Sequence, residues 1–212
     1  TQNPMKKRIL AAVLLLFPIV LPAQEGRVEV RYEAVETLTP EVQGLMEFLE
    51  VYYLKATVHG DIRGKKWVLW AHQVENGEVS SRPLVARTME FADTTASFTF
   101  YAQAKDSLTG YVRVVTPNYA TAKIPYPIDS GNGTEYPSQY ILMETFPEQP
   151  YDTTQDIPLA AFTTGLVQPM DFEGRKSLWI DFCGLRDAHA DPKTWQEQYH
   201  VPRFVYFSLR ME

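Results

Sequence analysis

The sequence predicts an all-β protein, built as an antiparallel two-sheet β-sandwich of jelly-roll-like type with about nine or ten strands and one or two short helices. Aromatic residues make up 13% of the chain, and aromatic side chains favour strands. The 15 prolines divide the chain into short segments. Within many of these segments, apolar and polar residues alternate with the period of a strand. An α+β fold is the alternative, because two segments have a helical pattern.

The first of these segments is followed by one of the two predicted helices. From Arg27 to Glu36, every second residue is apolar, which predicts a half-buried strand. A short helix is expected from Pro40 to about Leu49, because Thr39 suits the N-cap and proline suits the first helical position. Its apolar residues share one face, which we expect to pack against a sheet: Val42, Leu45, Met46 and Leu49.

The central part of the chain predicts two β-hairpins. Residues 66–75 contain a run that is apolar on both faces, as in a central strand. Asn76 and Gly77 follow at once, and both tolerate the positive φ of a tight hairpin turn. Other strands are expected at 51–59, 85–91, 96–105 and 111–116, the last two joined by a turn at 106–110.

The second half of the chain has longer predicted loops. They are expected at 117–139 and 147–158, where turn-forming residues cluster. Cys183, the only cysteine, falls in a predicted strand and is expected to be a buried, inert thiol. A short helix is expected from Asp191, as N-cap, to about His200. Strands are predicted at 140–146, 177–183 and 203–210, while 159–167 fits either a strand or a turn.

The N-terminal residues have the features of a secretory signal peptide. Three basic residues follow Met5, the expected start, and the apolar run from Ile9 to Leu21 comes next. This run has 13 residues, whereas a helix that spans a bilayer needs about 20. We therefore expect residues 1–23 to be removed, with no transmembrane segment left. The product would be a single β-sandwich domain at 24–212, exported to the periplasm or the cell surface.

The charge of the chain restricts its partners. Residues 1–23 carry three basic residues and no acidic one, so their removal changes the formal net charge from −6 to −9. A protein of this charge repels phosphate backbones, and no basic stripe in the sequence reverses this locally. Nucleic acids and anionic membrane surfaces are therefore disfavoured as partners. A glycan or an envelope protein remains as the expected partner.

The common catalytic motifs are missing from the sequence. The chain has no phosphate-binding glycine loop, no Gly-x-Ser-x-Gly, no Ser-x-x-Lys, no His-Glu-x-x-His and no Cys-x-x-Cys. This argues for a non-catalytic protein without a cofactor, although catalytic groups can also converge from distant positions. The best metal-ligating pattern is Asp187, His189 and Asp191, whose side chains would project to one side of an extended loop. The alternative for Asp191 is its role as a helix cap.

A second candidate site is a group of tyrosines and polar residues in and beside the predicted loops. Tyrosine rings stack on the C–H faces of sugars, while carboxylates and amides bind sugar hydroxyls. The simpler alternative is that these rings pack the loops onto the domain. The candidate ligand-binding residues are Tyr119, Tyr126, Tyr136, Tyr140, Asp129, Asn132 and Glu135.

These observations favour an exported, non-catalytic protein with a binding or assembly role at the cell envelope. It would recognise either a glycan, through the loop tyrosines, or another protein, for example through an exposed edge strand. The rival hypothesis is a secreted hydrolase that uses a metal near Asp187–Asp191 or a pair of carboxylates. Candidates for that pair are Glu144, Glu148, Asp152 and Asp156.

Overall fold

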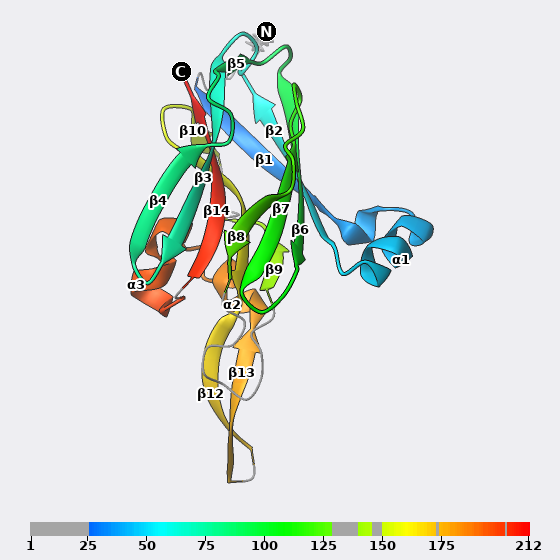
Figure 1. Cartoon of the computed structure of the whole chain (residues 1–212). Coiled ribbons are helices and arrows are strands. Elements are labelled where there is room, and N and C mark those ends of the chain that lie inside the picture. Colours follow the sequence, from blue (N-terminus) through cyan, green and yellow to red (C-terminus); the bar gives the residue numbers. More distant parts are fainter. Residues whose placement is uncertain (1–25, 129–139, 146–149, 173, 202) are drawn as a thin grey trace, which may run out of the picture.

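The computed structural model describes residues 26–128, 140–145, 150–172, 174–201 and 203–212. Two antiparallel sheets packed face to face form the body, which confirms the predicted all-β sandwich (Figure 1). The first sheet has the order β10 (Tyr151–Asp152), β1 (Arg27–Ala34), β2 (Tyr52–Gly60), β6 (Thr95–Ala104), β7 (Thr109–Val115) and β8 (Ile124–Pro127). The second has the order β4 (Glu78–Pro83), β3 (Lys66–Glu75), β14 (Arg203–Met211), β11 (Ile157–Thr164) and β9 (Tyr140–Met143), with β5 (Met89–Glu90) also paired to β3.

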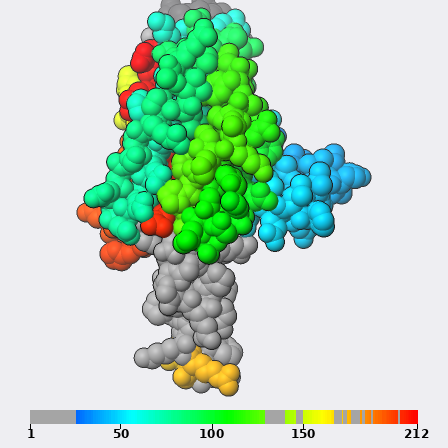
Figure 2. Space-filling model, viewed as in Figure 1, coloured from blue at the N-terminus to red at the C-terminus, as the bar shows by residue number. Residues whose placement is uncertain are grey.

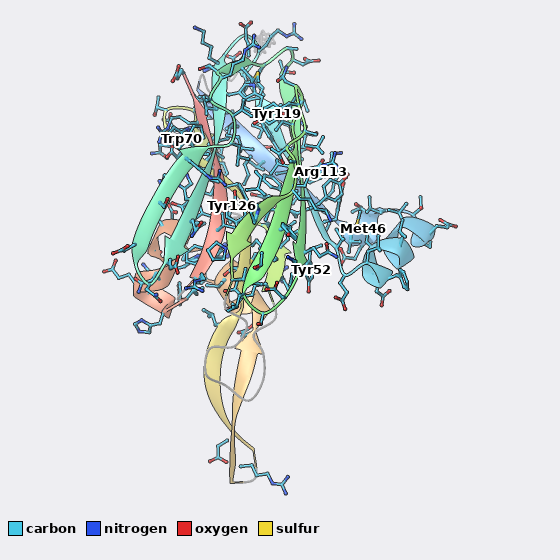
Figure 3. The ribbon with its side chains drawn as sticks, viewed as in Figure 1. Met46, Tyr52, Trp70, Arg113, Tyr119 and Tyr126 are labelled. Atoms are coloured by element: carbon cyan, nitrogen blue, oxygen red, sulfur yellow. The ribbon has the colours of Figure 1, made fainter. Side chains whose placement is uncertain are left out.

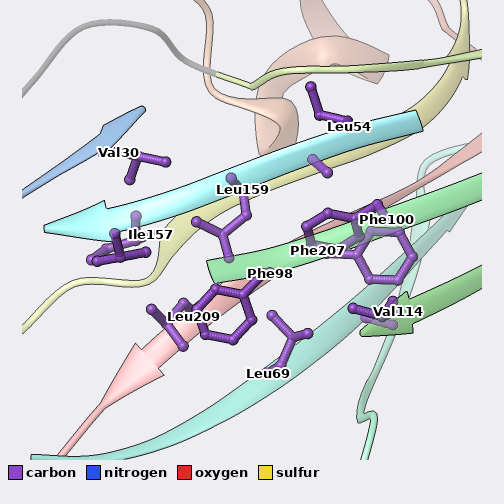
Figure 4. Close-up of a cluster of buried hydrophobic side chains, with 14 of the residues drawn as sticks. Val30, Leu54, Leu69, Phe98, Phe100, Val114, Ile157, Leu159, Phe207 and Leu209 are labelled. Carbon is purple, nitrogen blue, oxygen red and sulfur yellow. The ribbon is translucent and has the colours of Figure 1, made fainter. Parts of the chain in front are cut away.

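The core lies between the two sheets and combines aliphatic side chains with aromatic rings (Figure 4). Trp67 on β3 is fully buried, stacks on Phe91 at 5.5 Å and meets the edge of Phe98 at 5.2 Å between ring centroids. Phe100 of the first sheet meets Phe207 of the second at 5.2 Å. The inward positions alternate along β6 as the sequence predicts, so the hydrophobic pattern fixes which face of each strand is buried.

The strand predictions are confirmed for the two hairpins and corrected elsewhere. Asn76 and Gly77 have positive φ and join β3 to β4. The strand expected at 85–91 is wrong in length, because only Met89 and Glu90 pair with β3. The loop expected at 117–139 contains β8, which pairs with β7 although its sequence has two prolines; an edge strand tolerates proline.

A third pair of strands leaves the body. β12 (Leu166–Phe172) and β13 (Arg175–Asp181) form a two-stranded ribbon that extends away from the sandwich (Figure 1). The strand predicted at 177–183 is confirmed only as far as Asp181, and it belongs to this ribbon rather than to either sheet of the body. The strand ends at Asp181, whose carboxylate accepts a hydrogen bond from the Gly184 amide at 3.0 Å and so caps α2 (Phe182–Asp187). Cys183 accordingly lies in a helix.

The outer faces of the two sheets differ. The second sheet is covered by the segment that contains η2 (Pro192–Thr194) and α3 (Trp195–Tyr199), and Trp195, Val201 and Phe204 form a second cluster there. This explains why every residue of β11 is buried. The predicted capping role of Asp191 is confirmed, since its side chain accepts a hydrogen bond from the Lys193 amide at 2.9 Å.

The connection between β1 and β2 projects from the first sheet. It contains η1 (Val35–Thr37) and α1 (Pro40–Phe48), which form the helix that the sequence predicts. The expectation that this helix packs against a sheet is wrong, because none of its residues is buried. Figure 2 shows the connection standing out from the body. In the described part of the chain, no helix is both long enough and apolar enough to cross a bilayer.

Candidate functional site: the α1 arm

The α1 arm, defined here as residues 35–51, carries most of the strongly exposed apolar side chains of the described structure. Phe48 is 83% exposed and Leu45 is 56% exposed. Val42 and Leu49 complete the same stripe at helical spacing. A single exposed leucine on a surface needs no explanation, but a stripe on a helix with no buried residue does. The arrangement presents an apolar surface rather than burying one.

Side-chain hydrogen bonds hold the arm in place without burying it. The Gln43 amide donates to the carbonyls of Leu38 at 2.8 Å and Glu36 at 3.2 Å, which braces the helix against the preceding turn. The Gln103 side chain on β6 donates to the carbonyl of Leu49 at 2.7 Å and ties the end of the arm to the first sheet. Polar contacts of this kind position the helix, while its apolar stripe stays open to solvent.

The end of the helix has a defined geometry. The Glu50 amide donates to the carbonyl of Glu47 and the Val51 amide donates to that of Met46, the two bonds of a Schellman motif. Glu50 occupies the left-handed region with a φ of 53°, a conformation that usually falls to glycine. The arm thus ends sharply and returns the chain to β2.

The charge of the arm has one sign. It carries four glutamates, and residues 35–51 contain no lysine or arginine: the glutamates are Glu36, Glu41, Glu47 and Glu50. At the N-terminal end of α1, hydrogen bonds from the Glu41 amide and from Thr39 lower the pKa of the Glu41 carboxyl group. The arm that carries the apolar stripe is therefore negatively charged.

A groove of about 790 Å³ runs where the arm meets the body. Met46 contributes from the arm and Tyr52 from β2, and both are labelled in Figure 3. Ile141 and Leu142 on β9 extend the apolar lining. Glu36, Glu47 and Glu50 supply charged groups of the lining, and among the described residues no cation contributes to it. The groove and the stripe together suit an apolar ligand with positive charge around it.

Of the predicted sugar-binding tyrosines that the structure describes, Tyr126 and Tyr140 are buried and Tyr119 is half-buried against the core. Tyr126 and Tyr140 are each 2% exposed, and the Tyr140 hydroxyl donates to the carbonyl of Arg203 at 3.0 Å. Tyr119 stacks on Trp67 at 6.3 Å, and burial raises its pKa to about 12. These rings pack the body, as the simpler alternative expected. The other members of that group lie outside the described residues: Asp129, Asn132, Glu135 and Tyr136.

Of the three predicted metal ligands, the structure describes the side chains of His189 and Asp191. His189 is exposed with a φ of 50°, and the Asp191 carboxylate is engaged as a cap. Asp187 ends α2, and its side chain lies outside the described residues. Among the residues that the structure describes, no group of three or more potential protein ligands is close enough for a metal ion.

The carboxylates considered for a hydrolase have separate structural partners. Glu144 pairs with Arg186 at 3.3 Å, and Asp152 accepts from Thr154 at 2.8 Å. Asp156 accepts two hydrogen bonds from Arg210, at 2.7 and 3.0 Å, and these bonds lower the pKa of its carboxyl group. Glu148 lies outside the described residues. The three described carboxylates are used in turns and ion pairs.

A serine–histidine contact appears on the outer face of the second sheet. His72 Nδ1 is 2.7 Å from the Ser81 hydroxyl, and its Nε2 is 2.8 Å from the Ser208 hydroxyl. In a catalytic triad the third group is a carboxylate that stabilises the imidazolium, whereas here it is a hydroxyl. Burial also lowers the pKa of His72, which favours the neutral ring. The three side chains therefore act as a bridge between β4, β3 and β14.

Comparisons with known proteins add no constraint to this site. No family model, no curated protein and no solved structure matches the chain. The site therefore rests on the geometry of the arm. The sequence contains part of this signal, because Val42, Leu45 and Leu49 belong to the predicted apolar face. That prediction does not include Phe48, and it directs the face toward a sheet.

Proposed function

We propose that this chain is an exported, non-catalytic protein that binds another protein of the cell envelope through the α1 arm. The single observation that carries this proposal is the exposed stripe of Val42, Leu45, Phe48 and Leu49 on a helix with no buried residue. An isolated helix of nine residues is marginal in water, and tertiary packing normally supplies its stability. Docking of the stripe on a partner would supply that packing.

The charge of the arm specifies the chemistry of the partner. The arm that carries the stripe has four glutamates and no lysine or arginine. A partner surface with an apolar centre and lysines or arginines at its border would be complementary in both respects. An apolar helix seated in a groove is a common mode of recognition between proteins. We therefore propose that the partner is a different envelope protein, with an apolar surface that is bordered by lysines or arginines.

The edge strand considered from the sequence is a weaker candidate for this role. β4 is an edge strand of the second sheet with exposed side chains. It carries Glu78 and Arg82 and ends at Pro83, and charges and proline are the features that protect edges against pairing. Its one strongly exposed apolar residue is Val79. The arm offers a larger continuous apolar surface.

Site-specific photocrosslinking tests the proposal. A photoreactive benzoylphenylalanine replaces Phe48 on the arm in one variant and Val79 on β4 in a matched variant, each expressed in the native cell. We expect the first variant to give one dominant crosslink, mapped by mass spectrometry to an apolar surface with a lysine or arginine border. Adding Leu45→Ser should reduce its yield at least tenfold, and Glu47→Lys should reduce it severalfold.

Three results would contradict the proposal. A dominant crosslink from position 79 would move recognition to the edge strand. A crosslink from position 48 to a second copy of the same chain would make the arm a self-assembly surface. Equal yields with and without Leu45→Ser would show that the crosslink does not depend on the apolar stripe.

A further inference from the structure

A second surface, on the outer face of the first sheet, carries three tyrosines in neighbouring strands. We name it the tyrosine face: Tyr53 on β2, Tyr101 on β6, and Tyr111 and Arg113 on β7. The strand register places Tyr53 directly opposite Tyr101, and Tyr101 directly opposite Arg113. The rings of Tyr53 and Tyr101 meet edge to face at 5.6 Å. All three rings are half-buried, so part of each faces solvent.

Positive charge gathers on this face of an acidic protein. The ammonium groups of Lys105 and Lys123 lie 5.9 and 6.0 Å from the centroid of the Tyr111 ring, and Arg113, labelled in Figure 3, is exposed. No ion pair is found for these three cations among the described residues. Asp106 is next to Lys105 in the sequence, but its carboxylate accepts a hydrogen bond from the Leu108 amide, and this bond is the main cause that lowers the pKa of Asp106. The chain as a whole has a formal charge of −6, so the local sign is reversed.

A shallow hollow of about 190 Å³ lies between these groups. Tyr101 and Tyr111 supply aromatic walls, and Gln103, Arg113 and Lys123 supply polar groups. Lys123 donates to the Gln103 side chain at 3.5 Å, which places the amide and the ammonium at one end of the hollow. Pockets that enclose a drug-sized ligand are larger, about 300–1,000 Å³. The hollow therefore matches one small ring, with an open sheet on which the rest of a chain can lie.

We propose that the tyrosine face binds an acidic saccharide, with one carboxylate-bearing sugar ring seated between Tyr101 and Tyr111. The C–H face of the ring would stack on the tyrosines, which present large rigid apolar areas at small entropic cost. Its carboxylate would bind the guanidinium of Arg113, whose planar fork matches a carboxylate in two parallel hydrogen bonds. Gln103 and Lys123 would bind the ring hydroxyls. This site borders the α1 arm, because Val51 lines the hollow and Gln103 donates to the Leu49 carbonyl, but it does not depend on the proposed protein partner.

The surroundings favour a saccharide over other anions. A nucleic acid needs a basic surface that extends over many phosphates. Here the basic surface consists of three neighbouring cations on a chain whose formal net charge is −6. A lipid surface would need a broad basic and apolar patch, whereas this face carries three cations, Lys105, Arg113 and Lys123, and one strongly exposed aliphatic residue, Leu108, in the adjoining turn. The ligand must be recognised by a flat ring and a few charges.

Calorimetric titration with a defined uronic-acid oligomer tests the site. The ligand is tetragalacturonate, and its full methyl ester is the matched neutral ligand with the same rings. We expect the intact protein to bind the acid and to bind the ester at least tenfold more weakly. Arg113→Gln should weaken binding of the acid at least tenfold, and Tyr111→Leu should weaken both ligands. Arg87→Gln, which removes one exposed cation elsewhere, should leave binding unchanged.

Distinct outcomes would overturn this inference. Equal affinity for the acid and its ester would show that the protein does not recognise the carboxylate. Unchanged binding of the acid by Arg113→Gln would show that the ligand binds elsewhere. Absence of binding by the intact protein at millimolar tetragalacturonate, or binding to phosphatidylglycerol vesicles instead, would remove the saccharide assignment. The unfolding temperature of each variant is measured as a control. A value equal to that of the wild type shows that a loss of binding does not result from a loss of fold.

Discussion

α1 and α3 are both short helices placed in connections between strands, yet only α3 is built into the body. Trp195 of α3 is 1% exposed, meets Phe204 at 5.5 Å, and donates its indole N–H to the Ala190 carbonyl at 3.0 Å. The largest apolar residue of α1, Phe48, is 83% exposed. The two helices therefore differ in the direction of their largest side chain. In α3 it points into the body and stabilises the fold, whereas in α1 it points into solvent.

The comparison extends to the sheets that carry the two helices. The outer face of the second sheet lies under α3 and its neighbours, which bury Tyr206 and Phe204. The outer face of the first sheet keeps Tyr53, Tyr101 and Tyr111 half-exposed. The binding surfaces that we propose both lie on the uncovered side of the molecule. The covered side provides stability, so changes on the two sides should have separable effects.

The largest effect is expected for Trp195→Ala. Removal of a fully buried tryptophan leaves a cavity and should lower the free energy of unfolding by about 3–5 kcal/mol. Urea unfolding followed by fluorescence measures this as a fall in the midpoint at constant slope. Glu197→Ala, an exposed substitution on the same helix, is the control and should have an effect of less than about 0.5 kcal/mol. A loss below about 1 kcal/mol for Trp195→Ala would mean that α3 is not anchored.

Acidification should destabilise the covered side. His72 is buried there between Ser81 and Ser208 and stacks on Tyr206 at 4.5 Å. Burial is the largest cause that lowers the pKa of His72 below its usual value of 6.5. The unfolded chain therefore binds the proton more readily than the folded one. Stability is complete above that usual value and falls as the pH drops below it, until the folded-state pKa is passed.

Unfolding temperatures measured between pH 8 and pH 5 test this expectation. His72→Gln keeps groups that bond both serines but cannot be protonated, so its unfolding temperature should fall less over this range. His200→Gln removes an exposed histidine and is the matched control. An identical pH dependence in wild type and His72→Gln would show that another group is responsible.

A smaller effect is expected within the arm. Gly44 lies in the middle of α1, and a Cβ atom built there meets nothing within 4 Å. Gly44→Ala should therefore stabilise the helix by about 1 kcal/mol without a new contact. Hydrogen exchange of the α1 amides should slow severalfold, while that of α3 should not change. Unchanged exchange in α1 would indicate that the arm is already held by contacts other than its own helix.

The sequence predicted the sandwich because its strands carry their period in their own residues. β3 and β6 alternate or are apolar on both faces, and Asn76–Gly77 specifies its turn locally. The end of the strand at Asp181 was missed, because one carboxylate capping the Gly184 amide converts the next residues to helix. β8 was missed for a related reason, since prolines hide an edge strand.

The candidate sites were harder to predict for a different physical reason. Tyr126 and Tyr140 lie in and beside loop-like sequence, which allows either sugar binding or packing, and each is 2% exposed in the structure. Tyr53, Tyr101 and Tyr111 come from three strands, and only the pairing register puts them on one face. An amphipathic pattern shows that a helix has an apolar face without showing what that face meets. The arm and the tyrosine face are thus products of tertiary structure.

The smallest effect on stability is expected where the effect on binding should be largest. Phe48→Ser removes an aromatic ring that is 83% exposed, so the free energy of unfolding should change by less than about 0.5 kcal/mol. Urea unfolding of this variant beside Trp195→Ala gives the contrast directly. A loss of 2 kcal/mol or more would mean that Phe48 packs on the body in solution. The stripe would then be a part of the fold, and the difference between α1 and α3 would disappear.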